Sequence, residues 1–287
     1  DSRRSSPEDL LDWLAGALSI TLDPAQDLQE RTQAIIDAIE SRPASIYFID
    51  DLHHAVLRAV GGFSGIKILL RILHSTSEEH LWVCTFHRPT WSYLTGVRSS
   101  INLDVFRLRI DLDPLSSRAL GEWVHHRAAQ AGFGLSFAGL AGNHRLTHEG
   151  DQSRKRAENA YWRLLADASM GIPSVAWHLF VPGLRGGPTP DTVEVAMFSS
   201  PSSEQLESSS DFDLFVLAAI VVHDSLDTDA LAEVLNAPLV QVQESRRQLE
   251  SMGVLVRSSH RPGATVPLAW WPAVRALLRQ KHFLSMR

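Results

Sequence analysis

Ile46-Tyr47-Phe48-Ile49-Asp50-Asp51 decides the fold, because it joins a short β-prone run to two adjacent carboxylates. An apolar run without alternation is typical of a strand that is buried on both faces of a parallel sheet. Downstream, residues 81–86 form a second apolar run and residues 106–112 a third strand-like segment. A helical pattern over residues 65–74 lies between the first two, so strands alternate with helices and predict an α/β fold.

Two amphipathic helices are predicted ahead of this strand. Ser6 and Pro7, followed by two acids, are typical of a helix start, and leucines on one face follow them. A second helix is predicted to open at Asp23-Pro24 and to end before Pro43. Residues 1–45 therefore offer two helices and no candidate for a strand.

Helices dominate the sequence that follows the third strand-like segment. Helical patterns cover residues 115–131 and 149–168, and Pro173 opens a short third helix. We predict that residues 114–181 form a helical subdomain.

The remaining sequence divides into a linker and a further domain. Residues 182–210 are rich in Pro, Gly and Ser and predict a linker, although the alternating residues 192–198 could add a strand. Three helical patterns, a hairpin and a last helix then follow, over residues 212–222, 228–235, 240–252, 254–268 and 272–283. This order predicts a winged helix over residues 211–287, after an α/β part over residues 1–113.

Charge and composition exclude several classes of protein. The chain has 33 acidic and 27 basic residues, a formal charge of −6, so its overall field attracts neither nucleic acid nor an anionic membrane. No apolar run approaches the roughly 18–20 residues that span a bilayer, and the first residues lack the order of a signal peptide. Cys84 is the single cysteine, which excludes an internal disulfide. We expect a cytoplasmic protein without membrane insertion.

The two carboxylates that end the first strand suit phosphoryl transfer. Asp50 is placed to hold Mg²⁺ through water, and Asp51 to polarise an attacking water. Thr85 and Arg88 emerge from the next strand, where a polar side chain could sense a γ-phosphate. The alternative interpretation is an ordinary strand that meets solvent at two acids.

Taken in order, these parts resemble bacterial P-loop ATPases of the AAA+ and STAND classes, over nearly the whole chain. Residues 49–53 are similar to a Walker B motif, residues 84–88 to a sensor 1 motif, and Gly171-Ile172-Pro173 to the Gly-x-Pro signature of the helical lid. The resemblance implies ATP and Mg²⁺ as cofactors. It implies Asp50 as the metal ligand, Asp50, Asp51, Thr85 and Arg88 as catalytic residues, and Gly171 and Pro173 as nucleotide contacts.

Two features depart from this family. Ser174 stands where many relatives carry an arginine that reaches the phosphates. No lysine follows a glycine anywhere in the chain, so the Gly-Lys-Ser/Thr phosphate loop is absent, and Gly16 is the only glycine before Asp50. The resemblance therefore implies that the chain begins inside the nucleotide domain, without the central strand and the phosphate loop. We expect a sheet whose middle position is vacant or filled from elsewhere.

Three functions remain open at this point. The first is a nucleotide-switched regulatory ATPase, inactive as this chain alone, which acts on an effector protein or a second copy of itself. The second is a DNA-binding ATPase or module of the origin-recognition or transposition type. Residues 211–287 carry eight acids and eight bases, which favours closure of the winged helix over the nucleotide domain, although Arg257 and Arg261 of the wing keep DNA possible. The third is a non-catalytic adaptor that kept the fold.

The thirteen histidines include the pairs His53-His54 and His125-His126. No His-Glu-x-x-His motif and no further cysteine accompanies them, so we favour surface or satisfied core histidines over metal ligands.

Overall fold

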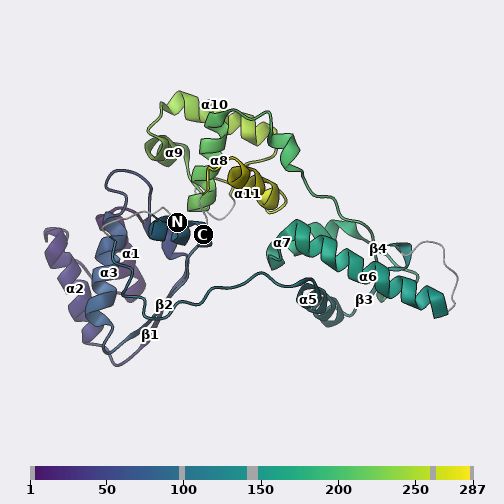
Figure 1. Ribbon diagram of the computed structural model, residues 1–287. Coiled ribbons are helices and arrows are strands. Elements are labelled where there is room, and N and C mark those ends of the chain that lie inside the picture. Colours follow the sequence, from purple (N-terminus) through teal and green to yellow (C-terminus); the bar gives the residue numbers. More distant parts are fainter. Residues whose placement is uncertain (1–3, 97–100, 141–147, 259–262, 285–287) are drawn as a thin grey trace. The chain divides into compact units, whose positions relative to one another are not determined.

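The computed structural model describes residues 4–96, 101–140, 148–258 and 263–284 (Figure 1). The chain divides into two compact units. Unit 1 holds Asp1–Arg109, Ser209–Val266 and Leu278–Arg287, and unit 2 holds Ile110–Ser208 and Pro267–Leu277. Within the described ranges, no helix is both long and apolar enough to cross a membrane.

The first part of unit 1 is mixed α/β, as predicted. Three helices share one apolar core with a two-stranded parallel sheet, and these elements are α1 (Pro7–Leu18), α2 (Leu28–Glu40), β1 (Ile46–Ile49), α3 (Ser64–Thr76) and β2 (Leu81–Cys84). Ser6 caps α1 as expected, because its hydroxyl accepts a hydrogen bond from the Asp9 backbone N–H. The predicted start at Asp23-Pro24 is wrong. Asp27 caps α2 instead, in a reciprocal capping box with Glu30.

The predicted burial of β1 on both faces is also wrong. Tyr47 and Ile49 point to the core formed with the helices, but Phe48 on the opposite face is 76% exposed. The same alternation holds in β2. The uncovered face of the sheet therefore consists of four apolar side chains in register, Ile46, Phe48, Leu81 and Val83.

The third predicted strand of this sheet is not formed. Residues 106–112 make no β-pairing, and Leu108, Ile110 and Leu112 are exposed. β1 and β2 are direct neighbours, and within the described ranges their sheet has no further strand. After β2 the chain forms the helix α4 (Arg88–Gly96).

The second part of unit 1 contains the helices and the hairpin expected after the linker. Three helices precede a short antiparallel pair, and these elements are α8 (Asp211–His223), α9 (Thr228–Leu235), α10 (Leu239–Ser251), β6 (Val256–Arg257) and β7 (Ala264–Thr265). Each helix packs against the other two. Gly263 has a φ of +98°, and a Cβ there would lie 2.1 Å from the Leu226 backbone, so only glycine fits at this approach. The last helix, α11 (Trp271–Gln280), lies mostly in unit 2, which holds Pro267–Leu277.

Unit 2 combines helices with a small mixed sheet. Its helices are α5 (Ser117–Gln130), α6 (His148–Ser169) and α7 (Pro173–Phe180), and its strands are β3 (Gly134–Ser136), β4 (Leu184–Gly186) and β5 (Thr192–Val195), in the order β3-β5-β4. Short 3-10 turns are η2 (Ala138–Leu140), η3 (Val181–Gly183) and η4 (Ser203–Leu206). An aromatic core of Phe137, Tyr161, Trp162 and Phe180 joins helices and sheet.

Residues 182–210, predicted as a linker that could add one strand over residues 192–198, contribute two strands to unit 2. Two of the three strands of this sheet, β4 and β5, come from that segment, and Val195 of β5 is buried in the aromatic core. The alternating pattern over residues 192–198 was the signal, and it outweighs the surrounding Pro and Gly.

Candidate functional site

Asp50, Asp51 and Thr85 lie together at the carboxyl ends of β1 and β2. The Thr85 hydroxyl donates to Asp50 Oδ1 at 2.5 Å and accepts from the Asp51 backbone N–H at 2.9 Å. Asp50 Oδ1 also receives the Asp51 N–H, at 3.1 Å. The Asp50 side chain is exposed. These three residues, called the strand-end cluster below, form the arrangement that the sequence predicted for two neighbouring parallel strands.

Parallel pairing explains why this cluster forms. Ile49 and Cys84 are register partners, so each strand delivers its next residue to the same edge of the sheet. The pairing continues one step further, because the Leu52 backbone N–H donates to the Thr85 carbonyl oxygen at 2.9 Å. The backbone pairing therefore fixes the positions from which the short side chains of Asp50 and Thr85 meet.

The other predicted site residues lie outside this cluster. Arg88 is exposed at the first position of α4, and within the described ranges it makes no ion pair with Asp50 or Asp51. Gly171 and Pro173 belong to unit 2, where they join α6 to α7. Gly171 has a φ of +66°, and a Cβ there would lie 2.6 Å from the Leu115 carbonyl oxygen. The backbone conformation and the close approach at this position therefore require glycine.

A sharp turn follows the strand-end cluster. Asp51 has a φ of +56°, a left-handed conformation that non-glycine residues adopt rarely, and the 3-10 turn η1 (Leu52–Ala55) begins directly after it. This turn reverses the chain, so that His53 enters the protein interior and is only 1% exposed.

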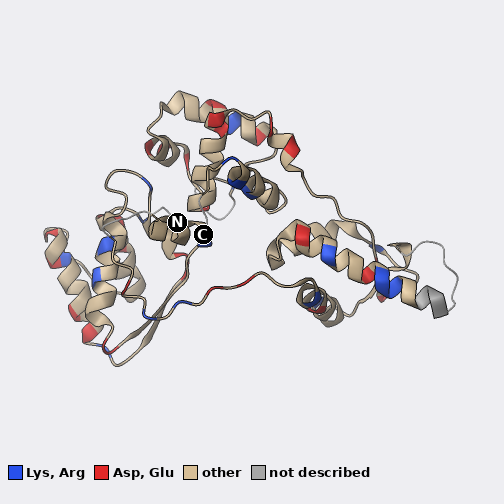
Figure 2. Cartoon of the chain, in the orientation of Figure 1, with Lys and Arg blue, Asp and Glu red and all other residues tan. Residues whose placement is uncertain are grey.

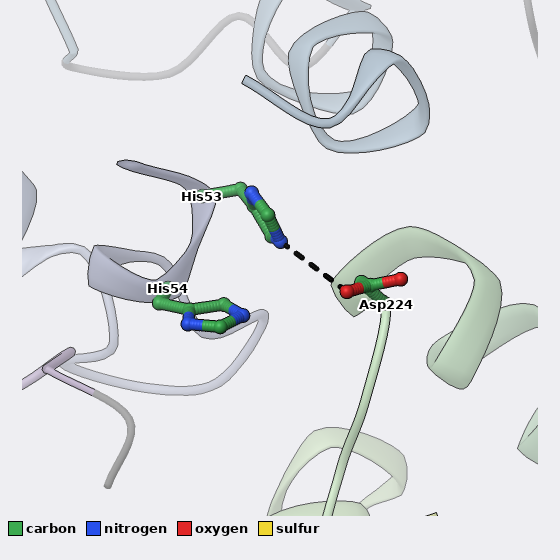
Figure 3. Close-up of side chains that lie close together, drawn as sticks. All are labelled: His53, His54 and Asp224. Carbon is green, nitrogen blue, oxygen red and sulfur yellow. Dashed lines mark ion pairs between the residues drawn. The ribbon is translucent and has the colours of Figure 1, made fainter. Parts of the chain in front are cut away.

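His53 lies among other metal-ligating side chains (Figure 3). Its Nε2 is 3.8 Å from Asp224 Oδ2, and its Nδ1 is 3.7 Å from Asp51 Oδ1. The His54 ring stands edge to face against the His53 ring, with centroids 4.4 Å apart. One ligand atom from each of His53, His54 and Asp224 lies within 4.8 Å of the other two. We call these three residues the His–His–Asp cluster.

The end of α8 holds Asp224 in place against the α/β part of unit 1. The buried Thr90 hydroxyl of α4 donates to the Val222 carbonyl oxygen. The Arg58 backbone N–H donates to His223 Nε2 at 3.0 Å, while His223 Nδ1 lies 2.8 Å from the Ala219 carbonyl oxygen. Because Nε2 accepts, the proton of a neutral His223 ring lies on Nδ1 and is donated to Ala219.

Sequence reasoning missed the His–His–Asp cluster. The prediction of satisfied histidines fits His125, whose Nε2 is 2.6 Å from Glu158 Oε1 in unit 2. It did not foresee that His53 and His54 meet a carboxylate from the end of α8. No spacing rule links residues so far apart in the sequence, so only the fold could bring them together.

Charges on the helices after residue 210 are mixed, as expected. Figure 2 shows both signs on α10, where Arg246 is engaged within the protein. Its guanidinium donates to Glu250 Oε1 and to the Thr228 hydroxyl, each at 2.8 Å. Arg247 of the same helix is exposed, as is Arg257 of β6. The wing residue Arg261 lies outside the described residues.

Comparisons with known proteins do not assign this chain to a family. A scan of the chain against models of protein families finds no match, and a search of curated protein sequences finds none either.

Proposed function

We propose that this chain is part of a nucleotide-switched regulatory ATPase of the AAA+/STAND type that binds Mg-ATP. The hydrogen bond between Asp50 and Thr85 supports this proposal most directly. It joins an acid and a hydroxyl across the ends of two neighbouring parallel strands. Ligands of open α/β sheets bind outside this edge of the sheet.

The strand-end cluster has the side chains that such chemistry needs. Asp50 is exposed and anionic, and a carboxylate suits Mg²⁺ directly or through a water molecule. Asp51 would orient and polarise the water that attacks the γ-phosphate, and Thr85 would report on that phosphate through its hydroxyl. Arg88, exposed at the start of α4, would supply positive charge to the phosphates from the same edge.

The residues that would cradle the triphosphate must come from outside these 287 residues, because the chain contains no Gly-Lys-Ser/Thr sequence. The uncovered face of the sheet agrees with this requirement. Parallel sheets are almost always covered on both faces, and here Phe48 and its apolar neighbours are exposed on one of them. The proposal thus assigns to this chain one wall of the nucleotide site.

The helices and hairpin after residue 210 would act as the winged helix of the switch. Their order of three helices and an antiparallel pair supports that assignment. The contacts of α8 with Thr90 and Arg58 support an intramolecular role, because they hold the end of α8 against the α/β part. DNA binding is the second candidate, with Arg247 and Arg257 as exposed bases, but Arg246 is already engaged with Glu250.

Within unit 2, Gly171 and Pro173 are the residues proposed to contact the nucleotide. Pro173 occupies the first turn of α7, and the backbone before it is fixed by Gly171, whose carbonyl oxygen accepts from the Leu115 N–H at 2.9 Å. A backbone of fixed shape is suited to press on the adenine and the ribose.

The proposal is tested by Asp51→Asn in the protein as its gene encodes it. We expect turnover of Mg-ATP to fall by about 100-fold or more, since removal of a water-activating group costs about that much, while ATP affinity stays within a few-fold. Single-turnover hydrolysis and binding of a fluorescent ATP analogue measure the two quantities. Asp104→Asn, an exposed loop acid, is the matched control. Unchanged turnover in Asp51→Asn would reject the assignment, and absence of nucleotide binding would favour the adaptor.

A further inference from the structure

The His–His–Asp cluster brings three metal-ligating groups together from two segments that are far apart in the sequence. His53 and His54 come from η1, and Asp224 follows α8. Within unit 1, one ligand atom from each lies within 4.8 Å of the others, and His53 is fully enclosed. Figure 3 shows the Asp224 carboxylate facing the His53 ring, with the His54 ring beside them.

We propose that these three side chains bind one divalent transition-metal ion, of which Zn²⁺ is the representative. Two imidazoles and one carboxylate form a common Zn²⁺ ligand set, with a water molecule in the fourth position. Ligand atoms about 2.0–2.1 Å from a tetrahedral ion lie roughly 3.3 Å from one another. His53 Nε2 and Asp224 Oδ2, 3.8 Å apart, need only a small approach to reach that spacing.

The two nitrogens of His53 face the partners that a metal ligand requires. Nε2 faces Asp224, and Nδ1 faces Asp51 Oδ1 on the other side of the ring. A histidine that binds a metal through one nitrogen almost always directs the other N–H to a carboxylate, a carbonyl or water. Asp51 thus stands where it would orient the His53 ring. The cluster uses neither Asp50 nor Thr85, but it shares Asp51 with the proposed nucleotide site. Zn²⁺ titration without nucleotide, and the variants His54→Ala and Asp224→Asn, therefore test the metal proposal separately from ATP turnover.

The two aspartates that face His53 both have a backbone conformation that is uncommon for residues other than glycine. Asp51 and Asp224 are non-glycine residues with positive φ, of +56° and +68°. Such conformations are uncommon for non-glycine residues and gather at functional sites, where the surrounding structure maintains them. Here they aim one carboxylate at each nitrogen of a single buried histidine.

A metal ion at this position would tie the turn after β1 to the end of α8. His53 lies two residues after Asp51, and Asp224 directly follows the last residue of α8. The ion would therefore stabilise the arrangement in which α8 contacts Thr90 and Arg58. Release of the metal would loosen that arrangement without altering the apolar core of either part.

The experiment is titration of the metal-free 287-residue chain with Zn²⁺, followed by calorimetry, and with Co²⁺, followed by its visible absorption. We expect one ion per chain, and an absorption spectrum typical of tetrahedral Co²⁺. His54→Ala and Asp224→Asn should each weaken Zn²⁺ binding by about 100-fold or more, because each removes a direct ligand. Asp51→Asn should weaken it by about 10-fold, the effect expected of a positioning carboxylate.

Two controls separate loss of the metal from loss of the fold. Asp224→Asn keeps the size of the side chain, and asparagine tolerates positive φ, so the thermal unfolding of this metal-free variant should match that of the wild type. His74→Ala removes an exposed histidine of α3 and should leave Zn²⁺ binding unchanged. The proposal is overturned if the wild type takes up no Zn²⁺, or if His54→Ala and Asp224→Asn bind it as tightly as His74→Ala does. Competition by millimolar Mg²⁺ would also overturn it, because Mg²⁺ prefers oxygen ligands.

Discussion

Both faces of the β1–β2 sheet carry mainly apolar side chains, but one face is packed against helices and the other is exposed. Tyr47, Ile49, Trp82 and Cys84 point into the core shared with α1, α2 and α3, whereas Ile46, Phe48, Leu81 and Val83 point away from it. The apolar run of each strand is suited to burial on both faces. The strands thus have the composition of a sheet that is buried on both faces, although only the face packed against α1, α2 and α3 is covered.

The largest expected effect lies on the covered face. Ile49→Ala should lower the free energy of unfolding of the chain by about 2–5 kcal/mol, because it leaves a cavity beside a side chain that is only 5% exposed. Urea denaturation followed by far-UV circular dichroism measures this change. Val60→Ala is the matched control, since this fully exposed side chain should change the same quantity by less than about 0.5 kcal/mol. Equal losses in the two variants would contradict the assignment of faces.

Alkylation of cysteine tests the covered face by a second route. Burial raises the pKa of the Cys84 thiol from 9.0 to about 12, and only the thiolate reacts with iodoacetamide. At neutral pH Cys84 should react about 100-fold more slowly than the thiol introduced by Phe48→Cys in a Cys84→Ala background. Mass spectrometry over time gives both rates.

The pH dependence of the two alkylation rates also distinguishes the two faces of the sheet. A raised pKa keeps Cys84 protonated, so its rate should continue to rise about tenfold per pH unit beyond pH 9. The rate at position 48 should level off near about pH 9, as expected of an exposed thiol. Similar rates and similar pH profiles at both positions would show that the two faces are equally accessible.

The smallest effect on stability is expected on the uncovered face. Phe48→Ser should change the free energy of unfolding by less than about 0.5 kcal/mol, because the side chain is 76% exposed. It should nevertheless reduce the binding of an apolar dye and the tendency to aggregate, since it interrupts an exposed apolar patch. Dye fluorescence and light scattering measure the two properties. A loss of stability comparable to that of Ile49→Ala would mean that Phe48 is buried by something in solution.

Much of the fold follows from local patterns in the sequence. The cap at Ser6, the apolar runs of β1 and β2 and the helices after residue 210 all carried their own signals, and the structure confirms them. The start of α2 did not, because Asp23-Pro24 and Asp27 both offer acceptable caps and only the capping box with Glu30 decides between them. Residues 106–112 have a strand-like sequence, but no strand in the described part of the chain pairs with them.

Likewise, only part of the candidate site could be predicted from the sequence. The meeting of Asp50 with Thr85 was predictable, because adjacent parallel strands deliver their ends to one edge of a sheet. The meeting of His53 with Asp224 was not, because it depends on how α8 contacts the α/β part of unit 1. Contacts that follow from one strand order can be predicted from a sequence, whereas contacts that depend on the docking of two packed parts require the structure.

The contacts at the end of α8 also determine which substitutions this junction tolerates. Two of the bonded groups, the Val222 carbonyl and the Arg58 N–H, belong to the main chain and persist when those side chains change. Only Thr90 and His223 contribute side chains, and both are fully enclosed. Variation in related sequences should therefore be broader at position 58 than at positions 90, 222 and 223, because Thr90, Val222 and His223 are all buried. The contacts at the end of α8 are thus expected to persist in related proteins even where the exposed residues around them differ.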